Sequence, residues 1–258
     1  MRVLALVPAV VFLSGCLQDL KVVRLKPDGS GTIVHTRRLR EWVIDMIRKN
    51  GLSDDFTEEK MRENAAKLGA VEFVSAEKAN IDGWVGMTST YSFKDVSKVK
   101  LDDDGSLSIA LEKRPNGNML LTAHSPFKPS KPGVGKEESK LPDDLMRALF
   151  SGMKVSTSVE VDGTVVACSS PHVAGSVLTI CELELDQLFA EQERLKKMAA
   201  REPATLEEAK ETIEALRVLH ALEGGGAMDL ESARKALARI KGVKHALAPV
   251  VTLEFKPK

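Results

Sequence analysis

Alternation of apolar and polar residues between positions 83 and 96 is the sequence feature that most constrains the fold. Four apolar side chains fall on one face of an extended strand: Val85, Met87, Tyr91 and Phe93. The opposite face carries hydroxyl side chains: Thr88, Thr90 and Ser92. A strand of this kind covers a core with one face and meets water with the other, which is typical of antiparallel sheets.

Strand signals recur along most of the chain. Turn residues of the Pro, Asp, Asn and Gly type separate two pairs of apolar runs, which predicts hairpins over 21–39 and 106–125. A further strand is expected over 70–75. The closing segment "APVVTLEF" (248–255) is expected to return to the main sheet as its last strand.

Helical spacing interrupts these strands and dominates after residue 186. Helices are predicted over 39–47 and 58–68, the second with Thr57 as N-cap and Gly69 after its end. Three amphipathic segments follow residue 186, one of them opened by a Thr205–Glu208 capping box. We therefore predict an α+β fold, with an antiparallel sheet packed with helices and a helical insertion before a C-terminal strand.

The predicted organisation has three parts. Residues 1–15 form a signal peptide, residues 16–185 form the α+β domain, and residues 186–258 form a helical segment whose final strand returns to the sheet. The stretch 125–142, which is rich in proline and charged residues, is expected to be a mobile surface loop. A short helix is expected to follow it over 143–150.

Charge balance excludes one class of partner. The chain has 37 Lys plus Arg against 37 Asp plus Glu, so its formal charge is zero. Nucleic-acid-binding proteins usually concentrate basic residues, and many stack bases on aromatic side chains, which make up only 4% here. No nucleic-acid partner is predicted.

The N-terminus differs from everything after it. Arg2 precedes an apolar run over 3–13, which is shorter than the roughly 20 residues that a membrane-spanning helix needs. A basic start, a short apolar run and small residues after it are typical of a secretory signal. A buried strand or helix is the alternative, but no alternation or capping residue supports it.

The four residues after this run, "LSGC" (13–16), resemble the lipobox of bacterial lipoproteins. The resemblance implies cleavage before Cys16, diacylglycerol on its sulfur, and an acyl chain such as palmitate on the new amino terminus. Two or three chains anchor a protein durably, whereas one does not. In that family an Asp after the cysteine retains the protein at the inner membrane. Leu17 stands there instead, which favours the outer membrane, on its periplasmic side.

Two further cysteines, Cys168 and Cys181, lie in two β-rich runs around a Ser, Pro and Gly turn. If these runs form a hairpin, the two side chains fall nearly opposite each other, and an exported protein could join them by a disulfide bond. Two free buried thiols are the alternative. A metal site is not predicted, because the five histidines have no ligand spacing with the cysteines.

The segments "VSTSVEVDGTVVACSSPHVAGSVLTICELEL" (155–185) and "YSFKDV" (91–96) are similar to the LppM-like lipoprotein domain. The resemblance implies an α+β domain with an antiparallel sheet, carried on a lipid anchor. Family members commonly have an aromatic residue where Cys181 stands, and some have a C-terminal membrane helix, which this chain lacks. The family therefore supports the architecture more than an activity.

No catalytic, cofactor or metal site is predicted. "LDDDGSLS" (101–108) has part of the spacing of a calcium loop, but its glutamate is out of register, so a turn is the better interpretation. His35, His124 and His172 fall in strands or near turns and are expected to be ordinary surface side chains.

The predicted role is a non-catalytic envelope lipoprotein, held in the membrane by its N-terminal lipid, that binds a protein partner or maintains the envelope. One alternative is a carrier of a lipid or other apolar ligand. The other is a hydrolase without a recognisable motif, which would require a pocket with convergent carboxylates or a Ser–His pair.

Overall fold

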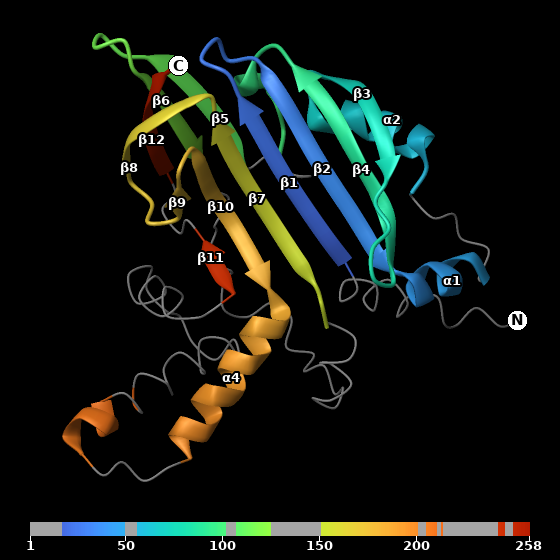
Figure 1. Cartoon of the computed structure of the whole chain (residues 1–258), viewed down its shortest axis with the longest axis vertical. Helices are drawn as coiled ribbons and strands as arrows, with labels where there is room; N and C mark the ends of the chain where they lie inside the picture. Colours follow the sequence, from blue (N-terminus) through green and yellow to red (C-terminus); the bar gives the residue numbers. More distant parts are fainter. Residues whose placement is uncertain are drawn as a thin grey trace, which may run out of the picture.

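The computed structural model describes residues 17–49, 56–101, 107–124, 151–200, 205–210, 213, 242–245 and 250–258. These residues form two β-sheets with helices at their margins, so the predicted α+β class is confirmed (Figure 1). Within these ranges, no helix combines the length and the apolar content that crossing a bilayer requires.

The larger sheet has eight strands in the order β11-β10-β7-β1-β2-β4-β3, with β9 paired to β10. Their bounds are β1 Leu17–Leu25, β2 Gly31–Arg40, β3 Val71–Lys78, β4 Trp84–Phe93, β7 Lys154–Val161, β9 Val173–Ala174, β10 Val177–Glu184 and β11 Val243–His245. The hairpin of β1 and β2 confirms the prediction for 21–39.

One pair of neighbours in this sheet is parallel, which differs from the predicted antiparallel sheet. β1 and β7 run side by side in the same direction, with Val23 opposite Val159. A tight turn forces its two strands to be antiparallel, but these strands are far apart in the sequence and no turn sets their direction. The sheet is therefore mixed.

The smaller sheet has four strands in the order β5-β6-β12-β8. Their bounds are β5 Ser108–Lys113, β6 Met119–His124, β8 Gly163–Cys168 and β12 Val250–Pro257. The predicted hairpin over 106–125 is confirmed as β5 and β6. The closing strand β12 lies between β6 and β8, in this second sheet and not in the larger one.

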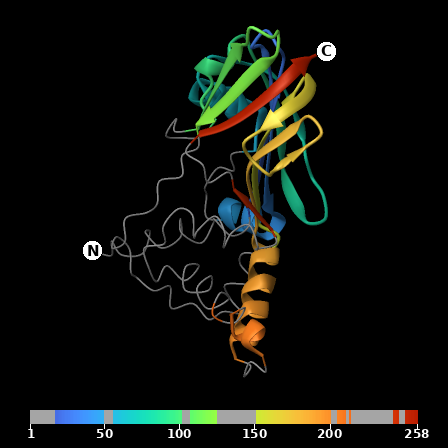
Figure 2. The same cartoon turned by 90° about the vertical axis from the view of Figure 1, so that its left-hand side faces the viewer.

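The hydrophobic core lies between the two sheets (Figure 2). Both sheets contribute side chains with at most 1% exposure: Val23, Leu25, Ile33, Tyr91, Val159, Leu178 and Ile180 from the larger sheet, and Leu121, Leu253 and Phe255 from the smaller. Removing this much apolar surface from water is the main source of stability in such a fold.

Three helices flank the sheets: α1 Glu41–Lys49, α2 Glu58–Ala65 and α4 Leu185–Ala199. The predicted N-cap of α2 is confirmed, because the Thr57 hydroxyl accepts a hydrogen bond from the Lys60 amide. Met61 is buried on the core side of α2, and its carbonyl accepts a hydrogen bond from the Tyr91 hydroxyl at 3.0 Å. Two short 3-10 turns, Ala66–Leu68 and Val96–Lys98, lie near the sheets as well.

The chain changes sheets at Asp162. β7 ends at Val161 in the larger sheet, and β8 begins at Gly163 in the smaller. A β-carbon on Gly163 would lie 2.5 Å from the Lys256 carbonyl oxygen, so the close approach of the two strands requires glycine there. The predicted turn near residue 175 is present between β9 and β10, but the expectation that Cys168 lies opposite Cys181 is wrong, because β8 pairs with β12 and β10 pairs with β7.

Several predicted features lie outside the described residues. They are the signal peptide and Cys16, the loop over 125–142, the helix over 143–150, most of the turn over 101–108, and the last predicted helix over 229–241. Of the helix that follows Thr205, residues 206–210 are described as helical, and the Glu208 amide donates to the Thr205 hydroxyl as a capping box requires.

Candidate functional site

The strands of the larger sheet bring together several groups at one end, which we call the Leu17 end. It contains the start of β1, the end of β2, the starts of β4 and β7, and the end of β10. The helices α1 and α4 both begin there, directly after β2 and β10 (Figure 1). Cys16 lies outside the described residues, but it is joined to Leu17 by one peptide bond, so the chain enters the sheet at this end.

A charged cluster occupies the inner face of the sheet at the Leu17 end. The inner face is the one that carries Val23 and Ile33, and residues two apart on a strand share a face. The Asp19 cluster comprises Asp19, Lys21, His35, Arg37 and Ser89, which are brought together by pairing of β1 with β2 and of β2 with β4.

Asp19 is the centre of this cluster. Its carboxylate oxygens lie 3.0 Å from His35 Nε2, 3.4 Å from Lys21 Nζ and 3.6 Å from Arg37 Nε. Burial by itself raises the pKa of Asp19. The hydrogen bond with His35 and the neighbouring positive charges outweigh burial and bring this pKa down to about 2. Asp19 is therefore a carboxylate throughout the neutral range.

His35 is largely shielded from solvent beside Asp19 and is not the surface side chain that the sequence suggested. Only 13% of its side chain is exposed. Burial lowers the pKa of His35 below 6.5, and the attraction of Asp19 does not offset this. A neutral imidazole facing a carboxylate donates from Nε2 to Asp19 Oδ1. The lasting positive charges beside Asp19 are therefore those of Lys21 and Arg37.

Ser89 stands next to His35 across the β2–β4 pair, so the cluster contains a serine, a histidine and an aspartate. A hydrolase would need the serine hydroxyl bonded to the imidazole and open to substrate. Ser89 is 0% exposed, and its Oγ has no hydrogen-bond partner among the described residues. This arrangement therefore does not present a nucleophile.

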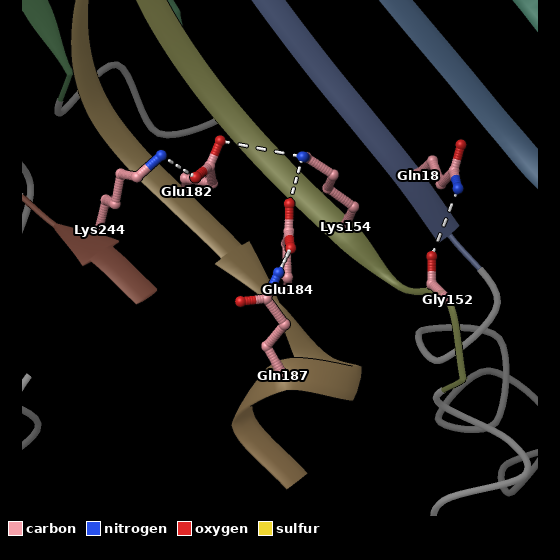
Figure 3. Close-up of polar contacts among 7 residues, drawn as sticks. All are labelled: Gln18, Gly152, Lys154, Glu182, Glu184, Gln187 and Lys244. Carbon is pink, nitrogen blue, oxygen red and sulfur yellow. Dashed lines mark hydrogen bonds and ion pairs between the residues drawn. The ribbon is translucent and has the colours of Figure 1, made fainter. Parts of the chain in front are cut away.

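The outer face at the Leu17 end carries a second group of charges. Lys154 on β7 contacts Glu184 directly and lies 3.9 Å from Glu182, which pairs in turn with Lys244 on β11 (Figure 3). Gln187, in the first turn of α4, donates to Glu184. These contacts join three neighbouring strands and the start of α4. The ionic groups neutralise one another, which suits a structural role.

The two cysteines lie on different sheets and are free thiols, so the expected disulfide bond is not formed. Cys168 is opposite Leu253 on β12, and Cys181 is opposite Thr157 on β7. Burial, followed by the charge of Glu182, raises the pKa of the Cys181 thiol, which keeps it protonated. The alternative of two separate thiols is the one that the structure supports.

Two hollows are lined by described residues. One, of about 700 Å³, lies beside α1 and is bordered by Arg40, Trp42 and Asp45. The other, of about 500 Å³, lies at the far end of the larger sheet, near Arg24 and Glu160. Within the described ranges, no three or more His, Cys, Asp or Glu side chains are grouped as metal ligands.

Sequence reasoning missed the Asp19 cluster, although a signal was present. In β1 the residues of the inner face are Leu17, Asp19, Lys21, Val23 and Leu25. Two charged residues in the middle of an otherwise apolar face indicate a change of environment along the strand. Their partners on β2 and β4 depend on the register and could not be assigned from spacing alone.

No family model matches the chain, and no curated protein matches it. Among solved structures, the chain is similar to the folded domain of the LppM protein of Mycobacterium tuberculosis, determined by NMR. The two have 14% sequence identity and a TM-score of 0.31, over 71% of this chain and 88% of that chain. The similarity is weak and carries no argument here, so the proposals that follow rest on the residues of this chain.

Proposed function

We propose that the chain is an envelope lipoprotein, anchored through lipid on Cys16, that acts without catalysis by binding a protein partner or maintaining the envelope. The observation that carries this proposal is that the described pairing of β1 uses only residues after Cys16. β1 is described from Leu17, the residue directly after Cys16. It pairs with β2 over its whole length, from Leu17 opposite Leu39 to Leu25 opposite Gly31. A signal peptide removed before Cys16 would leave the whole strand intact.

The described pairing of β1 needs no residue before Leu17. Inner strands of the larger sheet are eight to ten residues long, and β1 already spans nine residues from Leu17 to Leu25. Both of its edges are occupied, by β2 and β7, over nearly its whole length. The run before Cys16 is therefore not required to complete this part of the fold, as expected of a processed signal.

The absence of catalysis in this proposal rests on the Asp19 cluster. Asp19 is held ionised by fixed positive charges, His35 donates to it, and Ser89 is closed to solvent. An acid–base pair would need groups that change protonation near neutral pH and reach a substrate. The cluster instead resembles an internal ion pair that fixes the pairing of β1 with β2.

Binding on the surface is favoured over carriage of an apolar ligand. The side chains between the two sheets, among them Leu121, Ile180 and Phe255, are 0 to 1% exposed and belong to one contiguous cluster. A carrier would need space of several hundred Å³ with an apolar lining. These side chains pack into one cluster among the described residues, and the two hollows described above have charged borders.

The anchor is tested by replacing Cys16 with alanine in cells and following both lipid labelling and membrane retention. Cys16→Ala should abolish labelling with a palmitate analogue and release the protein from the membrane fraction. Cys168→Ala is the matched control, since it removes a cysteine of the folded domain and should leave both readouts unchanged. Retention of Cys16→Ala in the membrane would contradict anchoring through Cys16. Separation of inner and outer membranes from wild-type cells would test whether the protein is located in the outer membrane.

The role is tested by native mass spectrometry of the wild-type protein after gentle extraction. A stable complex with another protein supports the binding role. A co-purifying lipid in stoichiometric amount, beyond the covalent anchor, would replace it with the carrier alternative.

A further inference from the structure

We infer that helix α1 lies on the bilayer surface beside the lipid anchor, with Trp42 and Met46 inserted at the level of the lipid headgroups. This inference rests on the proposed anchor at Cys16. It adds a second, non-covalent contact that would fix the orientation of the folded domain on the membrane.

The first step is the distance from the anchor. Cys16 and Leu17 are neighbours in the chain, with Cα atoms about 3.8 Å apart. Leu17 pairs with Leu39, and paired residues of antiparallel strands are about 5 Å apart. Trp42 follows Leu39 by three residues, which span at most about 11 Å. A lipid on Cys16 would therefore hold the bilayer within roughly 20 Å of Trp42.

The second step is the shape of the helix. Val43 and Ile44 are each 1% exposed and attach α1 to the protein. Trp42 and Met46 are four residues apart, so they share one face, and they are 49% and 39% exposed. An apolar face toward the protein accounts for the burial of Val43 and Ile44, whereas 49% of Trp42 is exposed on the outside.

The third step is the chemistry of that outer face. Tryptophan is enriched at membrane–water interfaces because its ring is largely apolar and its N–H remains hydrogen-bonded. Charged groups of both signs, Arg40, Glu41 and Asp45, line the hollow beside Trp42, and the last turn of α1 is basic. An apolar centre with a charged border is the composition of interfacial helices, which lie in the plane of the membrane.

Helix α4, which also begins at the Leu17 end, has no exposed large apolar side chain among its residues with described burial. The exposed side chains of α4 with described burial are polar, charged or alanine: Asp186, Gln187, Ala190, Arg194, Lys196 and Lys197. α4 begins on the other side of β1 from α1 (Figure 1). The exposed apolar surface therefore belongs to the helix that follows the strand paired with Leu17.

The test uses the lipidated protein, which begins at Cys16, in vesicles of phosphatidylethanolamine and phosphatidylglycerol that carry brominated acyl chains. Bromine quenches only tryptophans at the membrane. Trp42 and Trp84 are the two tryptophans of the chain, and Trp84 is only 6% exposed. Trp42→Phe should lose most of the quenching seen in the wild type, whereas Trp84→Phe should keep it.

A control variant places a tryptophan far from α1. Val166 on β8 is 59% exposed and lies in the smaller sheet. Val166→Trp in the Trp42→Phe background should not restore quenching.

The outcomes separate the inference from the proposed anchor. Flotation of the protein with the vesicles depends on the lipid, and quenching depends on α1. Flotation without quenching of Trp42 would overturn the inference and leave the anchor in place, and would point to a protein partner or a second copy on this face. Failure of the wild type to float would overturn the anchor. If Trp84→Phe does not fold, the loss in Trp42→Phe still decides the question.

Discussion

Two halves of the same inner face differ sharply, although the same strands form both. Away from the Leu17 end, β1, β2 and β4 contribute Val23, Ile33 and Tyr91, which are completely buried under the smaller sheet. Closer to the Leu17 end, the same strands contribute Asp19, His35 and Ser89. The change takes place within two residues of β1. The face of β1 therefore changes from charged to apolar while its pairing with β2 and β7 continues unchanged.

The two halves are also stabilised by different physics. The apolar half gains free energy in proportion to the apolar area removed from water, about 25 cal/mol per Å². The charged half gains little on balance, because desolvating Asp19 and its partners offsets much of their attraction. Removing one charge of the cluster should nevertheless lower the free energy of unfolding strongly, because it leaves the other charges unpaired in a low-dielectric site. The following substitutions test this contrast, in order of expected effect.

The largest loss is expected in the apolar half. Phe255→Ala removes a fully buried ring from the centre of β12 and leaves a cavity between the sheets. The free energy of unfolding should fall by about 4 kcal/mol, measured by urea titration. Val166→Ala, at an exposed position of the neighbouring strand, should change it by no more than about 0.5 kcal/mol. Equal losses would show that the core does not lie between the sheets.

A smaller loss is expected when the charge at the centre of the Asp19 cluster is removed. Asp19→Asn leaves Lys21 and Arg37 without a counter-charge, which should cost about 3 kcal/mol at pH 7. Glu77→Gln, an exposed acid at the edge of the sheet, should have almost no effect.

The pH dependence sharpens this second prediction. The pKa of Asp19 is about 2 in the folded state and 3.8 as its ordinary value, so its charge stabilises the fold fully above pH 3.8. That contribution is lost as the pH falls toward 2. The difference between wild type and Asp19→Asn should therefore be smaller at pH 3 than at pH 7. An undiminished difference would contradict the assigned role of the charge.

The effect of His35 is expected to be smaller and confined to mild acid. Because burial lowers its pKa, the unfolded chain binds a proton below pH 6.5 that the folded chain does not, so stability falls as the pH falls. The slope from one such group is at most about 1.4 kcal/mol per pH unit. His35→Gln can still donate to Asp19 and should reduce the fall in stability between pH 7.5 and 5.5, measured by urea titration at each pH.

The smallest change in the free energy of unfolding is expected for Ser89→Ala. Unlike the other substitutions, it is not expected to destabilise the protein. The hydroxyl is buried without a hydrogen-bond partner, so Ser89→Ala should be neutral or stabilise the protein by up to about 1 kcal/mol. Ser30→Ala is the control, because the Ser30 hydroxyl donates to Asp28 at 2.7 Å and its removal should cost about 0.5 kcal/mol. A clear loss of stability in Ser89→Ala would mean that the hydroxyl has a partner or a ligand in solution.

Local features of the fold were predictable because the signals are local. Three such features are the β1–β2 hairpin, the β5–β6 hairpin and the Thr57 cap of α2. Each depends on residues that are close together in the sequence, namely a tight turn or the first turn of a helix. The prediction for the cysteines failed because Cys168 lies in β8, which leaves the larger sheet after Asp162. The glycine there allows β8 to approach β12, and this partner lies some ninety residues further along the chain.

By itself, the sequence determined the α+β class, the first hairpins and the balanced charge, because alternation, turn residues and composition act over short distances. It also supplied the four residues on which the proposed anchor depends. Only the tertiary structure decided that there are two sheets, that β1 and β7 are parallel, and that Asp19, His35 and Arg37 meet. These outcomes depend on pairing between distant segments, and the hydrogen bonds of a strand do not specify its partner. The choice is made by how well the buried faces pack once the whole chain has folded.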